Sequence, residues 1–231
     1  MLAAGAWGLG AAAWLVIGAA IGLWVPIPRR IVALVLGFGA GALVSALSFD
    51  LTEEAFRGAG TAVTAGGLAA GAATYFAGNL LLHRRSANAT AGAGILLGAL
   101  LDGVPESVVL GTTLLAGHGI SVSFLAAVVV SNLPEGLAGA RDLREDGHRP
   151  WRIIGLWVAV AVASAIAAAL GYGALGAMSA GPVAAAQAFA AGAIITMLAD
   201  TMFPEAFRNG GPAVGLATAL GFATAFLLST T

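Results

Sequence analysis

The sequence predicts an all-α polytopic membrane protein, with eight transmembrane helices in a 3+2+3 arrangement that contains an inverted repeat. Three observations predict this fold class. Hydrophobic residues make up 59% of the 231-residue chain and charged residues only 9%, which is too little polar surface for a soluble globule. Apolar stretches long enough to cross a membrane follow one another with short connections. One ten-residue segment also recurs late in the chain.

The apolar stretches define the helices. Crossing the hydrocarbon core takes about 20 apolar residues per helix. The stretches of this length cover about 5–25, 31–56, 62–83, 92–115, 120–140, 153–176, 181–206 and 210–230. The first lacks a basic leader and is too long for the apolar core of a signal peptide, so we expect it to be retained. Because the connections are short, we expect residues 1–231 to form a single transmembrane domain.

The arginines predict the orientation of these helices. Nine of the ten lie in the connections after the first, third, fifth and seventh predicted helices, namely Arg29, Arg30, Arg84, Arg85, Arg141, Arg144, Arg149, Arg152 and Arg208. The opposite side has only Arg57, and the chain has no lysine. Basic connections face the cytoplasm. We therefore expect a multi-pass protein of the cell (inner) membrane with both termini outside the cytoplasm.

Acidic residues are concentrated in the predicted helices. Eight of the eleven lie within or at the ends of apolar stretches, namely Asp50, Glu53, Glu54, Asp102, Glu106, Glu135, Asp200 and Glu205. A charge inside the membrane is costly, so such residues face the bundle interior and mark an ion path, a proton relay or a buried pair. The only arginines within a turn or two are at helix ends, so pairing does not account for Asp102, Glu106 and Glu135.

Two of these carboxylates follow a proline. In "LLDGVPESVVLG", Asp102 and Glu106 are spaced i and i+4 and share one helix face, and Ser131 and Glu135 repeat that spacing in "VVSNLPEGLAG". Each proline lacks an N–H and frees the carbonyl four residues earlier. Irregular backbone at membrane depth is tolerated where it is buried or lines a cavity. Two such kinks brought together predict an oxygen-rich cation site.

A second repeat predicts a transporter. "EAFRGAGTAV" at 54–63 and "EAFRNGGPAV" at 205–214 agree at seven of ten positions and close helices at opposite faces of the membrane. Inverted repeats around broken helices are a common plan of secondary transporters. Five acids near these segments are candidates for a pathway or gate: Asp50, Glu53, Glu54, Asp200 and Glu205. The Glu-to-Arg i, i+3 spacing in both copies equally fits an ion pair at a helix end.

The arrangement and the Pro-Glu motifs resemble the ZIP (Zrt/Irt-like) divalent metal transporters, whose fourth-helix motif reads His-Asn-x-Pro-Glu-Gly. "SNLPEG" at 131–136 matches in all but its first residue, and "DGVPES" at 102–107 matches in its proline and glutamate. The resemblance covers essentially the whole chain. It implies metal movement into the cytoplasm, zinc as cargo and a homodimer. It places Asp102, Glu106, Ser131 and Glu135 in a primary metal site, with Asn132 beside it.

The departures from the family pattern change the expected chemistry. Asp102 replaces the family's first histidine, and Gly103 replaces the asparagine after it. The sixth predicted helix has no acid, and Ser164 lies near the expected place, so we expect the adjacent second metal site to be lost. The remaining donors are oxygens, which suit harder ions than zinc. Mn²⁺ and Fe²⁺ therefore join Zn²⁺ as candidate cargo, and Cd²⁺ is a candidate through the family resemblance.

The sequence favours no other class as strongly. The chain has no cysteine, and His83, His118 and His148 all fall in predicted connections, so it contains no His-Glu-x-x-His motif of an intramembrane hydrolase. We expect no enzymatic activity, no resident cofactor and no nucleic-acid partner. The expected partners are divalent metal ions and the lipid bilayer. A proton-coupled transporter and a non-transporting ZIP-like protein with an eroded metal site both remain open.

Overall fold

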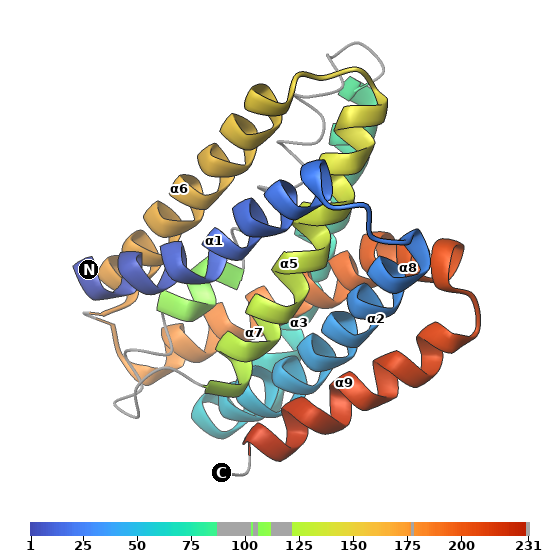
Figure 1. Ribbon diagram of the computed structural model, residues 1–231. Coiled ribbons are helices and arrows are strands. Elements are labelled where there is room, and N and C mark those ends of the chain that lie inside the picture. Colours follow the sequence, from blue (N-terminus) through green and yellow to red (C-terminus); the bar gives the residue numbers. More distant parts are fainter. Residues whose placement is uncertain (87–102, 104–105, 112–121, 177, 230–231) are drawn as a thin grey trace.

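The computed structural model describes residues 1–86, 103, 106–111, 122–176 and 178–229, and these residues form helices and short connections without a strand (Figure 1). The α-helices are α1 (Leu2–Trp24), α2 (Arg29–Ala46), α3 (Glu53–Ser86), α5 (Val122–Glu145), α6 (Pro150–Leu175), α7 (Ala180–Met197), α8 (Phe203–Gly210) and α9 (Ala213–Ser229). Two π-helical segments, η1 (Leu47–Thr52) and η3 (Leu198–Met202), join α2 to α3 and α7 to α8. The expected all-α class is confirmed for this part of the chain.

Five helical segments in the described part of the chain are long and apolar enough to cross a membrane. They are Leu2–Trp24, Arg29–Leu82, Ser123–Glu145, Pro150–Leu175 and Ala180–Gly210. Ala213–Ser229 is a shorter apolar helix. Large apolar side chains are exposed on the outer surface, among them Leu216 and Leu227. A surface of this kind is suited to contact lipid, and these helices are compatible with a multi-pass membrane protein.

The longest segment is broken by a glycine. A straight helix of 54 residues would be about 80 Å long, far more than the roughly 30 Å hydrocarbon core. Gly60 interrupts it with φ 75° and ψ 177°, a conformation that favours glycine. Gly211, 151 residues later, has φ 64° and ψ −155° and separates α8 from α9. The two copies of the repeated segment therefore turn the chain at corresponding glycines.

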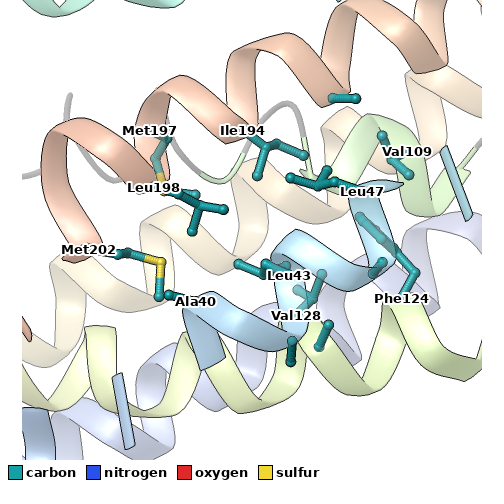
Figure 2. Packing of buried hydrophobic residues seen from close by; sticks show 14 of the residues in the cluster. Ala40, Leu43, Leu47, Val109, Phe124, Val128, Ile194, Met197, Leu198 and Met202 are labelled. Atoms are coloured by element: carbon teal, nitrogen blue, oxygen red, sulfur yellow. The ribbon is translucent and has the colours of Figure 1, made fainter. Parts of the chain in front are cut away.

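The helices pack in two sets. In the first set α2 lies along α9 and α3 along α7, and in the second α1 contacts both α5 and α6 (Figure 1). The two sets meet mainly where α2 packs on α5. A buried apolar cluster fills the centre, with Leu43 and Leu47 facing Phe124 and Val128 on one side and Ile194 on the other (Figure 2).

Four glycines let helices of the first set touch backbone to backbone. A Cβ atom on any of them would overlap a carbonyl oxygen of the facing helix. The distances would be 1.9 Å from Gly41 to Thr218 and from Gly221 to Phe38, 2.0 Å from Gly192 to Leu68, and 1.8 Å from Gly71 to Phe189. Small residues at such crossings are typical of membrane helix packing. Gly41 and Gly192 are 151 residues apart, as are Phe38 and Phe189, and the residues that they face on α9 and α3 are 150 apart, so both pairs of helices use corresponding contacts.

Arg141 connects α5 to the connection between α1 and α2. Its Nη1 donates to the Ile27 carbonyl oxygen at 2.6 Å and its Nη2 to that of Val25 at 3.0 Å. Arg29 forms an ion pair with Glu145. The α1–α2 and α5–α6 connections therefore lie at one end of the bundle. Arginines lie in or next to both connections, so we call this end the basic end; they are Arg29, Arg30, Arg141, Arg144, Arg149 and Arg152. These contacts keep α5 helical through Glu145, beyond its last apolar residue.

Candidate metal centre

The second Pro-Glu motif lies inside α5, where Pro134 leaves the Val130 carbonyl without its usual donor. This carbonyl lies against Gly39 of α2: a Cβ at Gly39 would be 3.1 Å from the Val130 oxygen and 2.9 Å from the Ser131 Cα. The small residue lets α2 and α5 approach closely beside Pro134. The unpaired backbone of α5 at this point is therefore buried in protein, where it is tolerated at membrane depth.

Glu106 lies in the other Pro-Glu motif, on the helical residues 106–111, and is only 5% exposed. This helical stretch packs on α6, because a Cβ at Gly111 would lie 2.3 Å from the Ala168 carbonyl oxygen. Moving a carboxylate out of water is costly unless it gains compensating interactions. A buried glutamate here is therefore a functional candidate. Asp102, the third expected carboxylate, lies outside the described residues.

Three candidate ligands lie on two successive turns of α5, with Ser131 and Asn132 about one turn before Glu135. Ser131 is 1% exposed and donates from Oγ to the Val128 carbonyl oxygen at 2.9 Å, which leaves its oxygen lone pairs for a further partner. Asn132 is 4% exposed and donates from Nδ2 to the Ala11 carbonyl oxygen of α1 at 3.0 Å. Glu135 is half-buried one turn after Ser131. The amide of Asn132 thus holds α1 on α5.

We expect Asn132→Ala to destabilise the protein by about 1 kcal/mol, because it removes this inter-helix bond and leaves the Ala11 carbonyl oxygen without its donor. Thermal unfolding in detergent, compared with the exposed Asp146→Asn, would measure the loss. An unchanged unfolding temperature would show that the bond contributes nothing.

The positions of the second metal site, which we expect to be lost, are partly described. Gly103, where the family has asparagine, faces α6, and a Cβ there would lie 3.3 Å from Ser164 Oγ. Ser164 is 2% exposed. The two positions are thus neighbours, but a glycine and a serine offer at most one hydroxyl. Within the described residues, no group of three His, Cys, Asp or Glu side chains is placed to hold a metal ion.

The candidate gate residues hydrogen-bond to neighbouring helices. Asp50, in η1, accepts a short hydrogen bond from Ser123 Oγ at the start of α5. Asp200, in η3, accepts from Asn79 Nδ2 of α3 at 3.2 Å. Both π segments therefore present an aspartate to another helix. Insertions of this kind occur frequently at functional sites.

The repeated Glu-Arg spacing does not form the expected helix-end ion pair. Arg57 pairs instead with Glu53 at 2.5 Å, one full turn away. Glu54 accepts from Gln187 Nε2 of α7 at 3.0 Å, and Gln187 is 2% exposed. In the second copy, the described residues include no ion pair between Glu205 and Arg208. The ion-pair interpretation is therefore wrong for the first copy, where Glu54 is directed to Gln187 and Arg57 to Glu53.

Glu205 lines a small cavity at the basic end. The cavity has a volume of about 30 Å³, and its polar wall comes from Glu205, Asp142, Asn209, Arg29 and Arg141. Glu54 lines a larger cavity of about 290 Å³, between the repeated segment and the start of α7, together with Gly58 and Gln187. Arginines line the cavity at Glu205 but not the cavity at Glu54.

The two cavities use corresponding residues. Six lining positions of the first are each 151 residues from a lining position of the second: Arg29 and Ala180, Val32 and Val183, Ala33 and Ala184, Leu36 and Gln187, Glu205 and Glu54, and Asn209 and Gly58. The chain from α2 to the start of α3 begins at the first cavity, at Val32, and reaches the second cavity at Glu54. The chain from α7 to α8 begins at the second cavity, at Val183, and reaches the first cavity at Glu205. The cavities therefore lie at opposite ends of the bundle.

Sequence reasoning missed Gln187, Ser123 and Asn79, which bind the candidate gate acids. Gln187 carried a signal, since it is the only glutamine and interrupts an alanine-rich stretch. A search against family models finds no match for this sequence, and a search of curated proteins finds no match either. The functional assignment therefore depends on the motifs and on the geometry of the site.

Proposed function

We propose that this protein is a membrane transporter that carries a divalent metal cation into the cytoplasm through a carboxylate site at Glu106 and Glu135. One observation carries the proposal: Glu106 is 5% exposed in an apolar, membrane-spanning bundle, directly after a proline, and Pro134-Glu135 repeats the pattern on α5. Buried carboxylates on kinked helices are the donors that a dehydrated cation needs. Asp102, Ser131 and Asn132 complete the proposed donor set.

The proposed architecture has eight spans in a 3+2+3 arrangement. The break at Gly60 divides the segment Arg29–Leu82 into two spans, and Gly211 separates the segment Ala180–Gly210 from Ala213–Ser229. Helical residues 103 and 106–111 fall within the fourth expected span. The first and last three spans form inverted copies, and the matched π segments, glycine contacts and cavities at an offset of 151 residues support this. The resemblance to ZIP transporters adds a homodimer to the proposal.

The basic end faces the cytoplasm in this proposal, because arginine-rich connections remain inside. The cavity at Glu54 is then the outer one and the cavity at Glu205 the inner one. The chain has no cysteine, so single introduced cysteines label without background. We expect a membrane-impermeant maleimide to label Gly58→Cys on intact cells and Asn209→Cys only after permeabilisation. The reverse pattern would invert the orientation, and labelling of both from one side would contradict the inverted repeat.

The cargo follows from the donors. Carboxylate, hydroxyl and amide oxygens suit Mn²⁺ and Fe²⁺, whereas the family resemblance favours Zn²⁺ and admits Cd²⁺. Two or three carboxylates around a divalent ion leave the site neutral or negative. Such a site attracts cations and repels anions.

Uptake by proteoliposomes tests the proposal. The purified protein would be offered Zn²⁺, Cd²⁺, Mn²⁺, Fe²⁺, Co²⁺ and Mg²⁺ in turn, with protein-free liposomes as the control. We expect saturable uptake of at least one transition-metal ion, and that ion would be the cargo. Proton movement without metal flux would favour the proton-coupled alternative. No flux of either kind would favour the non-transporting one, and both results would overturn the proposal.

A further inference from the structure

An apolar groove opens on the surface of the bundle and shares no lining residue with the two acidic cavities. It has a volume of about 580 Å³ and lies between α1, α2, α5 and α9. Only hydrophobic residues line it, and Ile31, Val35 and Leu220 are 51%, 37% and 64% exposed. Because these helices span the membrane, the groove faces hydrocarbon rather than water. Its occupant must therefore be apolar along the whole groove.

The groove lies between the two sets of helices. One wall comes from α1 and α5 through Trp14 and Leu133, and the other comes from α2 and α9 through Phe38 and Leu220. These walls belong to the two sets of helices that meet along α2 and α5. An occupant of the groove therefore contacts both sets at once.

A positive charge lies where the groove begins. Ile31 lines the groove in the first turn of α2, and Arg30 immediately precedes it at the basic end. Arg30 is exposed and lies one helical turn before Leu34, another lining residue. Its neighbour Arg29 pairs with Glu145, and Arg141 donates to backbone carbonyls, whereas Arg30 has no such partner among the described residues. An exposed guanidinium thus lies beside the apolar channel.

We propose that this groove binds an anionic phospholipid, with one acyl chain along Ile31, Val35 and Phe38 and the phosphate at Arg30. An acyl chain makes no polar demands on the wall, which has no polar group to offer. The charge at the basic end then selects the headgroup, because basic residues at the membrane surface attract anionic lipid. A second copy of the chain need not place an acidic residue at Arg30, whereas an anionic phospholipid always carries a negative phosphate. The charge of Arg30 therefore favours a lipid as the occupant.

Native mass spectrometry of the detergent-solubilised protein tests this inference. Equimolar phosphatidylglycerol and phosphatidylcholine with identical acyl chains would be added. We expect retention of one phosphatidylglycerol in preference to phosphatidylcholine. Arg30→Gln should lower that preference about fivefold. Val35→Trp should remove retention of both lipids, because the larger side chain fills the groove.

Two variants serve as matched controls. Arg144→Gln removes another exposed arginine of the basic end, and Val158→Trp enlarges an exposed apolar residue of α6, outside the groove. Both should retain lipid as the wild type does. Equal retention of the two lipids, or loss of preference in Arg144→Gln but not in Arg30→Gln, would overturn the inference. A lipid-free dimer that Val35→Trp dissociates would assign the groove to a second copy. The readout is lipid mass, so it is independent of metal flux.

Discussion

Replacing Gly71 with alanine is expected to lower the melting temperature of the purified protein by about 5–10 °C. The added Cβ would lie 1.8 Å from the Phe189 carbonyl oxygen, so α3 and α7 must separate. The overlapping atom is backbone, which no rotamer change can move aside. Separation would also disturb the Gly192 contact with Leu68, because it lies in the same helix pair. Thermal unfolding in detergent, followed by intrinsic fluorescence, measures the effect.

Gly66 supplies the matched control on the same helix. A Cβ at Gly66 meets nothing within 4 Å, and the residue is exposed. Gly66→Ala should therefore leave the melting temperature unchanged or raise it slightly, since alanine favours the helix by up to about 1 kcal/mol. Equal melting temperatures for the two variants would show that the α3–α7 contact is looser than the structure describes.

Much of the helix order could be predicted from the sequence, because a membrane helix needs a long apolar run. The expected boundary between 56 and 62 contains Gly60. The expected boundary between 206 and 210 ends one residue before Gly211. The π segments could not be predicted, since one extra residue in a turn leaves the hydrophobic pattern nearly unchanged.

The candidate site could be predicted in part. A glutamate after a proline in an apolar run marked Glu106 and Glu135, and the burial of Glu106 agrees with a role inside the bundle. The partner of Asn132 could not be predicted, because it depends on how α1 crosses α5. The partner of Glu54 depends in the same way on α7. Such contacts arise from helix packing between residues more than 100 positions apart, for which the sequence has no local signal.

Glu106→Gln is expected to reduce metal flux at least about tenfold while the protein remains folded. Glutamine has nearly the same shape as glutamate, so it preserves packing at a position that is 5% exposed. It removes the negative charge that offsets the cation's lost hydration. Initial rates of uptake into proteoliposomes, normalised to inserted protein, measure the loss. Glu135→Gln should act in the same way, and the double variant should abolish saturable flux.

Asp146→Asn is the control for this prediction, since Asp146 is exposed in the α5–α6 connection and its loss removes the same charge from the chain. It should transport as the wild type does. The melting temperature of Glu106→Gln distinguishes loss of a ligand from loss of the fold, because a variant that unfolds cooperatively near the wild-type temperature and lacks flux has lost the carboxylate and not the structure. Wild-type flux in the folded double variant would mean that metal crosses without these carboxylates. The α5 kink against Gly39 would then be a packing feature and not part of a transport site.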